Sequence, residues 1–206
     1  MKKNKLLIAL AIAACSAVVM ADDDKIDYTV GLKIWNNKLG WYTNAANSPI
    51  VSLTAKKGDY FLVSSFMLPA TYTWNEGSAE YMTRRDADLA VGWRMNSNVS
   101  LLAGQKKLGV NDYYSNSNHY STFNINYLGA NASNSIGEDK FVYGQVLSKI
   151  GKTVTNMTHL EAGLGSMISK NSQMTLGYRS QKFSNSSTGT SVNLRGYIFG
   201  VNHSFN

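Results

Sequence analysis

Apolar and polar residues alternate along much of the chain, most clearly between Asp86 and Lys107. Every second residue from Ala87 to Met95 is apolar, whereas the positions between them are charged or very small. A period of two predicts a β-strand whose two faces meet different surroundings. Turn-forming residues at 96–98 follow, and the alternation then resumes. The stretch therefore predicts a hairpin of two amphipathic strands.

A turn centred on Ser97 sets the register of this hairpin. It places Trp93 opposite Leu101 on one face and Asp88 opposite Lys106 on the other. Bulky apolar side chains thus share one face, and charges with glycine share the other. In a water-soluble barrel the aromatic face would point inward, whereas a barrel in lipid carries it outside. The mixture of bulky apolar residues and charges favours the barrel in lipid.

The alternation recurs in ten segments. Strands are expected at 26–35, 50–55, 60–68, 86–95, 99–107, 119–128, 140–150, 159–165, 174–179 and 192–205. Polar loops are expected at 36–48, 69–84, 108–118 and 183–191, with a longer turn at 129–139. Long and short connections mostly alternate, which is typical of outer-membrane barrels. The predicted fold is all-β: a closed antiparallel transmembrane barrel of ten strands, with short periplasmic turns and longer extracellular loops. Eight strands is the alternative.

Residues 1–21 have the organisation of a removable signal peptide. A basic start is followed by a short apolar run and a small-residue cleavage site at Ala21. Cleavage there leaves 22–206 as one barrel domain. The alternative is a lipoprotein box that leaves Cys15, the only cysteine, acylated. Both readings imply export, and neither provides a pair of thiols for a disulfide.

Composition narrows the class of protein further. Charged residues make up 16% of the chain, below the roughly 25% usual in soluble domains, and 12 tyrosines accompany only 2 prolines. Few charges and many aromatic residues suit a barrel with aromatic girdles. No glycine-rich phosphate loop precedes a helix, and only 3 histidines are present. We expect no cofactor, no metal and no nucleic-acid partner.

The alternation also assigns residues to the two faces of the barrel. The residues predicted to face lipid are Leu89, Val91, Trp93, Leu101, Leu160, Leu164, Leu176, Tyr178, Tyr197, Phe199, Val201 and Phe205. The polar residues predicted to line the lumen are Asp27, Lys33, Asp88, Arg94, Lys106, Glu161 and Arg179. Such a lumen is either filled by ion pairs or left as a narrow passage for small solutes. Basic residues near the loops are expected to meet lipid phosphates: Lys38, Arg84, Arg85, Lys106, Lys107 and Lys182.

The leader, the alternating strands and the C-terminal pattern resemble the small bacterial outer-membrane β-barrel proteins. The pattern reads Tyr197-x-Phe199-x-Val201-x-x-x-Phe205, although Asn206 follows the final aromatic residue. The resemblance implies a Gram-negative outer membrane, folding through the barrel assembly machinery, and contact with membrane lipid and lipopolysaccharide. The resemblance identifies no activity, and we expect a monomer that is not an enzyme. The expected role is structural, a small-solute channel or surface interaction.

Two short spacings are the candidates for catalysis. Asp86-x-Asp88 and His159-x-Glu161 each project from one strand face, close to the predicted loops. A histidine beside carboxylates can activate water as a general base. The arrangement resembles the omptin family of outer-membrane proteases, although the order of the second pair differs and Glu161 replaces an aspartate.

A second set of residue types resembles the lipid A deacylases. His119-x-Ser121 supplies a histidine and a serine, and Glu138 supplies a carboxylate. By the strand assignment Glu138 falls in the turn at the opposite end of that strand. The alternative function is therefore an outer-membrane protease or a lipid A-modifying hydrolase acting at the barrel mouth.

Overall fold

The computed structural model describes residues 25–40, 44–73, 80–114, 117–151, 155–185 and 191–205. The predicted signal peptide at 1–21, Cys15 and Asn206 lie outside these residues. Ten strands form the fold: β1 Asp27–Leu39, β2 Ala45–Lys57, β3 Tyr60–Thr73, β4 Tyr81–Arg94, β5 Val99–Tyr114, β6 Ser117–Ser135, β7 Lys140–Lys149, β8 Thr155–Ser169, β9 Ser172–Asn185 and β10 Ser191–Phe205. Within the described residues, no helix is long and apolar enough to cross a bilayer.

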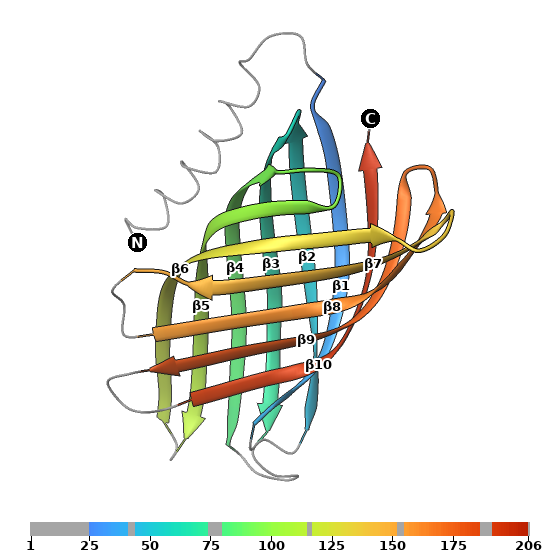
Figure 1. Ribbon diagram of the computed structural model, residues 1–206. Coiled ribbons are helices and arrows are strands. Elements are labelled where there is room, and N and C mark those ends of the chain that lie inside the picture. Colours follow the sequence, from blue (N-terminus) through green and yellow to red (C-terminus); the bar gives the residue numbers. More distant parts are fainter. Residues whose placement is uncertain are drawn as a thin grey trace.

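Each strand pairs antiparallel with its neighbour in sequence, and β1 pairs with β10 to close the ring (Figure 1). The predicted ten-strand closed barrel is confirmed. The register of the central hairpin is confirmed as well, because Trp93 pairs with Leu101 and Asp88 with Lys106. A short turn and a strict alternation leave little freedom for that register to slip.

The barrel has two different ends. Four connections of two to four residues, at 58–59, 95–98, 136–139 and 170–171, lie at one end, which we call the turn end. The other five connections define the loop end; four of them span five to seven residues, and the one between β5 and β6 spans two. The even strand number brings Asp27 and Phe205 to the turn end. This asymmetry matches the predicted arrangement of short turns and longer loops.

Several predicted loops are in fact paired strand, so their predicted bounds were wrong. β3 continues to Thr73 and β4 begins at Tyr81, which shortens the expected loop at 69–84. β5 reaches Tyr114 and β6 begins at Ser117, where a loop at 108–118 was expected. β6 likewise runs to Ser135. A register shift between Met67 and Ala70 accommodates Pro69, which cannot donate to the ladder.

The chemical character of the two faces reverses along the barrel. In the turn-side half, apolar residues are exposed on the outer face of all ten strands. We call these residues the outer band: Tyr28, Val30, Leu32, Ile34, Val51, Leu53, Phe66, Leu68, Val91, Trp93, Leu101, Leu128, Val142, Val146, Leu160, Leu164, Met174, Leu176, Tyr178, Tyr197, Phe199, Val201 and Phe205. In the loop-side half the outer face is mostly polar, as at Asn36, Lys38, Arg85, Asn124 and Lys182, although Tyr120 is also exposed there.

The interior of the loop-side half is mainly apolar instead. Its buried apolar side chains are Trp35, Leu39, Tyr72, Met82, Leu108, Ile125, Met157, Phe183, Leu194 and Ile198. Asn37 and Ser48 are buried there too, and Asn37 is hydrogen-bonded to Ser48 and to the Tyr72 hydroxyl. The sequence pattern had suggested that apolar side chains lie only on the outside of the barrel. In the loop-side half they also fill the interior. The turn-side half has the organisation of a barrel in lipid, whereas the loop-side half is built like a barrel in water.

Glycines in the turn-side half make room for aromatic rings inside the barrel. Phe61 pairs with Gly92 across β3 and β4, and Phe141 pairs with Gly165 across β7 and β8. A Cβ on either glycine would lie 2.1 Å from the ring of its partner. The rings thus cover the glycine backbone, which leaves no space for a larger residue.

Candidate functional site

A network of charged and polar side chains crosses the interior where the two halves of the barrel meet. Its first part centres on Glu161 of β8, which is 4% exposed. Glu161 accepts hydrogen bonds from Lys33 Nζ at 3.2 Å and from Arg179 Nε at 2.7 Å. His159 Nε2 lies 3.8 Å from the same carboxylate. Residues of β1, β8 and β9 are thereby joined.

Gln181 carries the network across the lumen to β4. Its Nε2 donates to His159 Nδ1 at 2.6 Å, and its Oε1 accepts from Arg84 Nη2 at 2.7 Å. Arg84 also donates through Nε to Asp86 Oδ1 at 2.8 Å and forms a second contact with the same carboxylate through Nη2. This two-contact geometry is the strongest arrangement for an arginine–carboxylate pair.

The last part of the network lies on β4, β5 and β6. Lys106 Nζ is 2.9 Å from Asp88 Oδ2 and 3.9 Å from Asp86 Oδ2. The Tyr127 hydroxyl donates to Asp88. We call the complete set the lumen network: Lys33, Arg84, Asp86, Asp88, Lys106, Tyr127, His159, Glu161, Arg179 and Gln181.

Aromatic side chains pack against the two arginines of the network. The guanidinium carbons of Arg84 and Arg179 lie 5.9 Å and 5.3 Å from the Trp35 ring centre, and Trp35 is completely buried. Arg84 also lies 4.9 Å from the Phe183 ring centre. These distances are within the range of cation–π attraction, which is stronger away from water. An apolar layer therefore packs against the loop side of the network.

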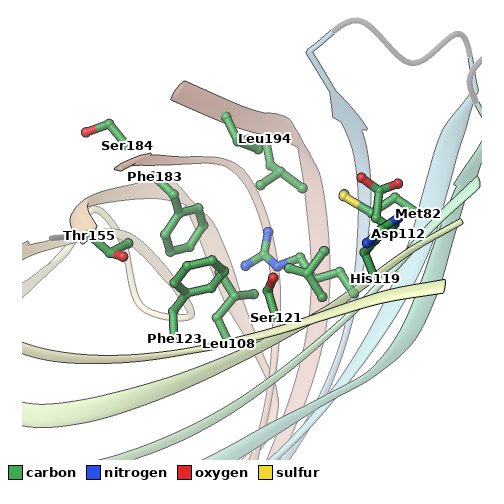
Figure 2. Close-up of a pocket in the computed structure, with 13 residues that line it drawn as sticks. Met82, Leu108, Asp112, His119, Ser121, Phe123, Thr155, Phe183, Ser184 and Leu194 are labelled. Carbon is green, nitrogen blue, oxygen red and sulfur yellow. The ribbon is translucent and has the colours of Figure 1, made fainter. Parts of the chain in front are cut away.

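The lumen network separates two cavities. The turn-side cavity has a volume of about 510 Å³ and reaches from Thr29 and Arg94 up to Lys106 and His159. The loop-side cavity has a volume of about 330 Å³, and Arg84 is the member of the network that lines it. Figure 2 shows the loop-side cavity, in which Phe123 and Phe183 point toward one another.

Asp112 and His119 lie near the loop end of this second cavity. They pair across β5 and β6, and both line the cavity. Burial raises the pKa of the Asp112 carboxyl above its usual range, and the nearby His119 opposes that rise. Partial burial disfavours the charged carboxylate.

The residues predicted to line the lumen lie on the inner face. Lys106, Glu161 and Arg179 are buried within the lumen network, and Lys33 and Asp88 are partly buried members of it. Arg94 lines the turn-side cavity. Asp27 is partly exposed at the turn end, where it pairs with Lys56 across β1 and β2.

The residues predicted to face lipid lie on the outer face. Val91, Leu164 and Leu176 are the most exposed aliphatic ones, each at 58%. Trp93, Leu101, Leu160, Tyr178, Tyr197, Phe199, Val201 and Phe205 are exposed too. Leu89 is only partly exposed.

The candidate catalytic residues come together, but not at the mouth of the barrel. Asp86, Asp88, His159 and Glu161 all belong to the lumen network, and the first, third and fourth are at most 5% exposed. Each carboxylate is paired with lysine or arginine. The second set is not assembled: His119 and Ser121 line the loop-side cavity. Glu138 lies in the connection at the turn end.

Two basic residues that were expected to meet lipid phosphates lie inside the barrel instead, and for Lys106 only its other prediction, a position in the lumen, is correct. Arg84 is 1% exposed and Lys106 is 6% exposed, so neither can meet lipid phosphates. Continuing the alternation of Asp86 and Asp88 by one step would have placed Arg84 on the inner face. Tyr127 was also missed as a polar partner, since its register against Asp88 depends on the neighbouring strand β5. Among the described residues, no group of three or more His, Asp or Glu side chains is suited to hold a metal.

The closed ring, its two unlike ends and its outer band define the fold of the outer-membrane β-barrel proteins. The chain is similar to the outer membrane protease OmpT of Escherichia coli, with a TM-score of 0.50 and 12% identity over 88% of this chain and 94% of that one. Neisserial surface protein A gives a TM-score of 0.47 and 12% identity over 89% of this chain and 100% of that chain. Ail of Yersinia pestis gives a TM-score of 0.43 and 14% identity over 89% of this chain and 100% of that chain. No family model and no curated protein matches the chain.

Proposed function

We propose that the protein is an integral, non-enzymatic barrel of the Gram-negative outer membrane whose lumen is sealed by the lumen network. The outer band supports the membrane location. It exposes apolar side chains on all ten strands, far more than an isolated apolar patch on a soluble monomer. On β10 the band runs from Tyr197 to Phe205, nine residues, close to the roughly 9–11 needed to cross a bilayer.

The main observation that supports a sealed lumen is the continuity of the lumen network. It joins β1, β4, β5, β6, β8 and β9 by direct contacts and is backed by the buried Trp35. A passage for small solutes would have to break buried ion pairs, which is costly. The supported role is therefore structural or surface-interacting, carried out from the loop end. Three cations lie on the outer face between the outer band and the loop end: Lys38, Arg85 and Lys182. We propose that they contact lipopolysaccharide phosphates.

Planar-bilayer recording tests the sealed lumen. The native protein should give no steady unit currents, whereas the double variant Arg84→Ala/Arg179→Ala should give discrete steps. The matched control is Arg85→Ala/Lys182→Ala, which removes two cations from the outer face of the same strands and should stay silent. Heat-modifiable gel mobility establishes that each variant has closed its barrel. Unit currents from the native protein would favour a small-solute channel instead.

A hydrolase is the second candidate, because Asp86, Asp88, His159 and Glu161 share one network. The burial and pairing of their carboxylates support the non-enzymatic role. Peptide and lipid A cleavage assays on the folded protein separate the two. The non-enzymatic proposal expects no cleavage. Cleavage that disappears in both Asp88→Ala and His159→Ala would establish the hydrolase.

A further inference from the structure

The turn-side cavity reaches from the lumen network to the turn end of the barrel. Its floor contains Lys106 and Arg179, which are buried members of the network. Its rim contains Thr29, Lys56 and Arg94, each within two positions of a strand end at the turn end. The rim side chains are partly exposed. A polar ligand can therefore enter from the turn end without crossing the network.

Cations outnumber carboxylates around this cavity. Five cationic side chains and one carboxylate line it: Lys33, Lys56, Arg94, Lys106 and Arg179, with Asp88. Glu161 does not line the cavity, but it is bonded to both Lys33 and Arg179. When Glu161 is included, the balance is 5 − 2 = +3, with His159 counted as neutral. The positive surplus favours an anion in this cavity.

Two of the five cations are not used by the fold. Among the described residues, the side chains of Lys56 and Arg94 form no ion pair or hydrogen bond. Asp27 pairs in register with Lys56, and the Asp59 carbonyl accepts from the Arg94 backbone N–H at 2.7 Å. Neither of these two carboxylates lines the cavity or forms an ion pair with a described residue. The donors of Lys56 and Arg94 are therefore available to a ligand.

Lys56 and Arg94 can reach the same group. Lys56 of β2 pairs with Phe61 of β3, which pairs with Gly92 of β4, and Arg94 lies two positions further on the same face. Neighbouring strands are about 4.8 Å apart, so β2 and β4 are about 10 Å apart. A lysine and an arginine side chain together span that distance. An anion at the rim can thus contact both.

The rest of the lining and the size of the cavity limit the body of the ligand. Apolar side chains such as Phe61 and Leu102 alternate with hydroxyl and amide groups: Ser52, Thr54, Ser65, Asn131, Gln145 and Gln173. Such groups hydrogen-bond to the hydroxyls of a polyol. At about 30 Å³ per water-sized group, a volume of about 510 Å³ holds about 17 non-hydrogen atoms.

We propose that the turn-side cavity binds a small phosphate monoester with a polyol body, the chemistry of a sugar phosphate. The phosphate carries about two negative charges at neutral pH and offers several acceptor oxygens. It lies at the rim against Lys56 and Arg94, and the polyol extends toward Lys33 and the floor. The site does not rest on the sealed lumen, because the cations line the cavity whether or not the network lets ions pass.

Isothermal titration calorimetry on the full barrel in phosphatidylcholine nanodiscs tests the proposal. Glucose 6-phosphate is the probe, because its about 16 non-hydrogen atoms match the cavity. Glucose lacks the charge and should show no binding, and gluconate has a single charge and should bind about tenfold more weakly. Equal binding of gluconate and glucose 6-phosphate would overturn the role of the phosphate. Inorganic phosphate should also bind about tenfold more weakly, and equal affinity would overturn the role of the polyol.

Two neighbouring lysines of β2 provide a matched pair of variants. Lys56 lines the cavity, whereas Lys57 lies on the opposite face of the strand. Each change to glutamine removes one positive charge from the turn end. Lys56→Gln should weaken glucose 6-phosphate about tenfold, and Lys57→Gln should leave the affinity within about twofold. Equal effects of the two changes would reduce the binding to a general attraction and refute the site.

A second pair of variants tests the location by filling the cavity. Thr54 lines it, whereas Leu53 is 45% exposed in the outer band. Thr54→Trp should abolish binding and Leu53→Trp should preserve it; unchanged binding in Thr54→Trp would place the probe elsewhere. If Thr54→Trp does not close its barrel, the lysine pair still decides. A silent native barrel that binds no glucose 6-phosphate would refute this site alone, and a conducting native barrel that binds it would refute the seal alone.

Discussion

Arginine substitutions on the outer face of β9 give the sharpest test of where the membrane lies. Leu176 is 58% exposed and pairs with Leu164, so it lies in the middle of the outer band. Ser180 lies four residues further toward the loop end on the same face and pairs with Leu160. At about 3.4 Å per residue and a tilt of about 40°, the two positions differ by about 10 Å in depth.

The expected magnitudes follow from that depth. Leu176→Arg should lower the free energy of unfolding by about 2–4 kcal/mol, because it places a charge near the bilayer midplane. Ser180→Arg should cost only about 0–1 kcal/mol, because its side chain reaches the interface. Leu176→Ala removes the same side chain without adding a charge, and so separates the cost of the arginine from the loss of leucine.

Reversible folding into phospholipid vesicles measures these differences. Urea titrations followed by tryptophan fluorescence give the free energy, and heat-modifiable gel mobility reports barrel closure. If the outer band faced water, both arginine variants would stay within about 0.5 kcal/mol of the native protein. Equal effects of Leu176→Arg and Ser180→Arg would therefore refute the membrane boundary drawn here.

Three further predictions concern the interior and the loop end. Glu161→Ala should lower the free energy of unfolding by about 3–5 kcal/mol, because Arg179 would be left as a buried unpaired charge; a loss below about 1 kcal/mol in the same urea titration would contradict the pairing. Gly196→Ala should lower the free energy of unfolding by about 1–3 kcal/mol, because the added Cβ would lie 1.8 Å from a backbone oxygen of β1. The control is Gly144→Ala, where the atom nearest to the added Cβ is 3.7 Å away. Asp112→Asn should stabilise the protein at neutral pH, because the folded-state pKa of Asp112 is raised and its carboxylate is disfavoured there. That gain should disappear as the pH falls below the usual aspartate pKa of 3.8, and a gain that grows on acidification would contradict it.

The parts of the fold that local chemistry determines could be predicted from the sequence. The turn at 96–98 joins two strictly alternating strands, so the pairing of Trp93 with Leu101 follows directly. The loop-side parts of the strands were missed for a physical reason. Their outer residues are polar, as at Asn36 and Lys38 in β1, and only pairing with the neighbouring strand shows that they are not loops.

The site could be predicted only in part. Alternation put Glu161 and Arg179 on one face, but it did not show which side chains meet across the ring. Arg84 and Gln181 are separated by 97 residues, and their contact depends on the stagger of strands around the whole barrel. No local pattern carries that information.

The position of the lumen network follows from the reversal of the two faces. On the turn side the barrel is apolar outside, so polar groups have to lie inside. On the loop side the interior is mainly apolar, and its buried polar side chains, such as Asn37 and Ser48, are uncharged and hydrogen-bonded. Charges from both β4 and β8 therefore meet at the boundary, where Trp35 and Phe183 close the apolar layer above them. Carboxylates and cations at that level are shielded from water on the loop side and are stable only when paired. A variant that extends the apolar interior by replacing Arg84 with leucine should consequently leave the buried Asp86 with only Lys106, 3.9 Å away, as its cation and destabilise the barrel, even though it improves the apolar packing.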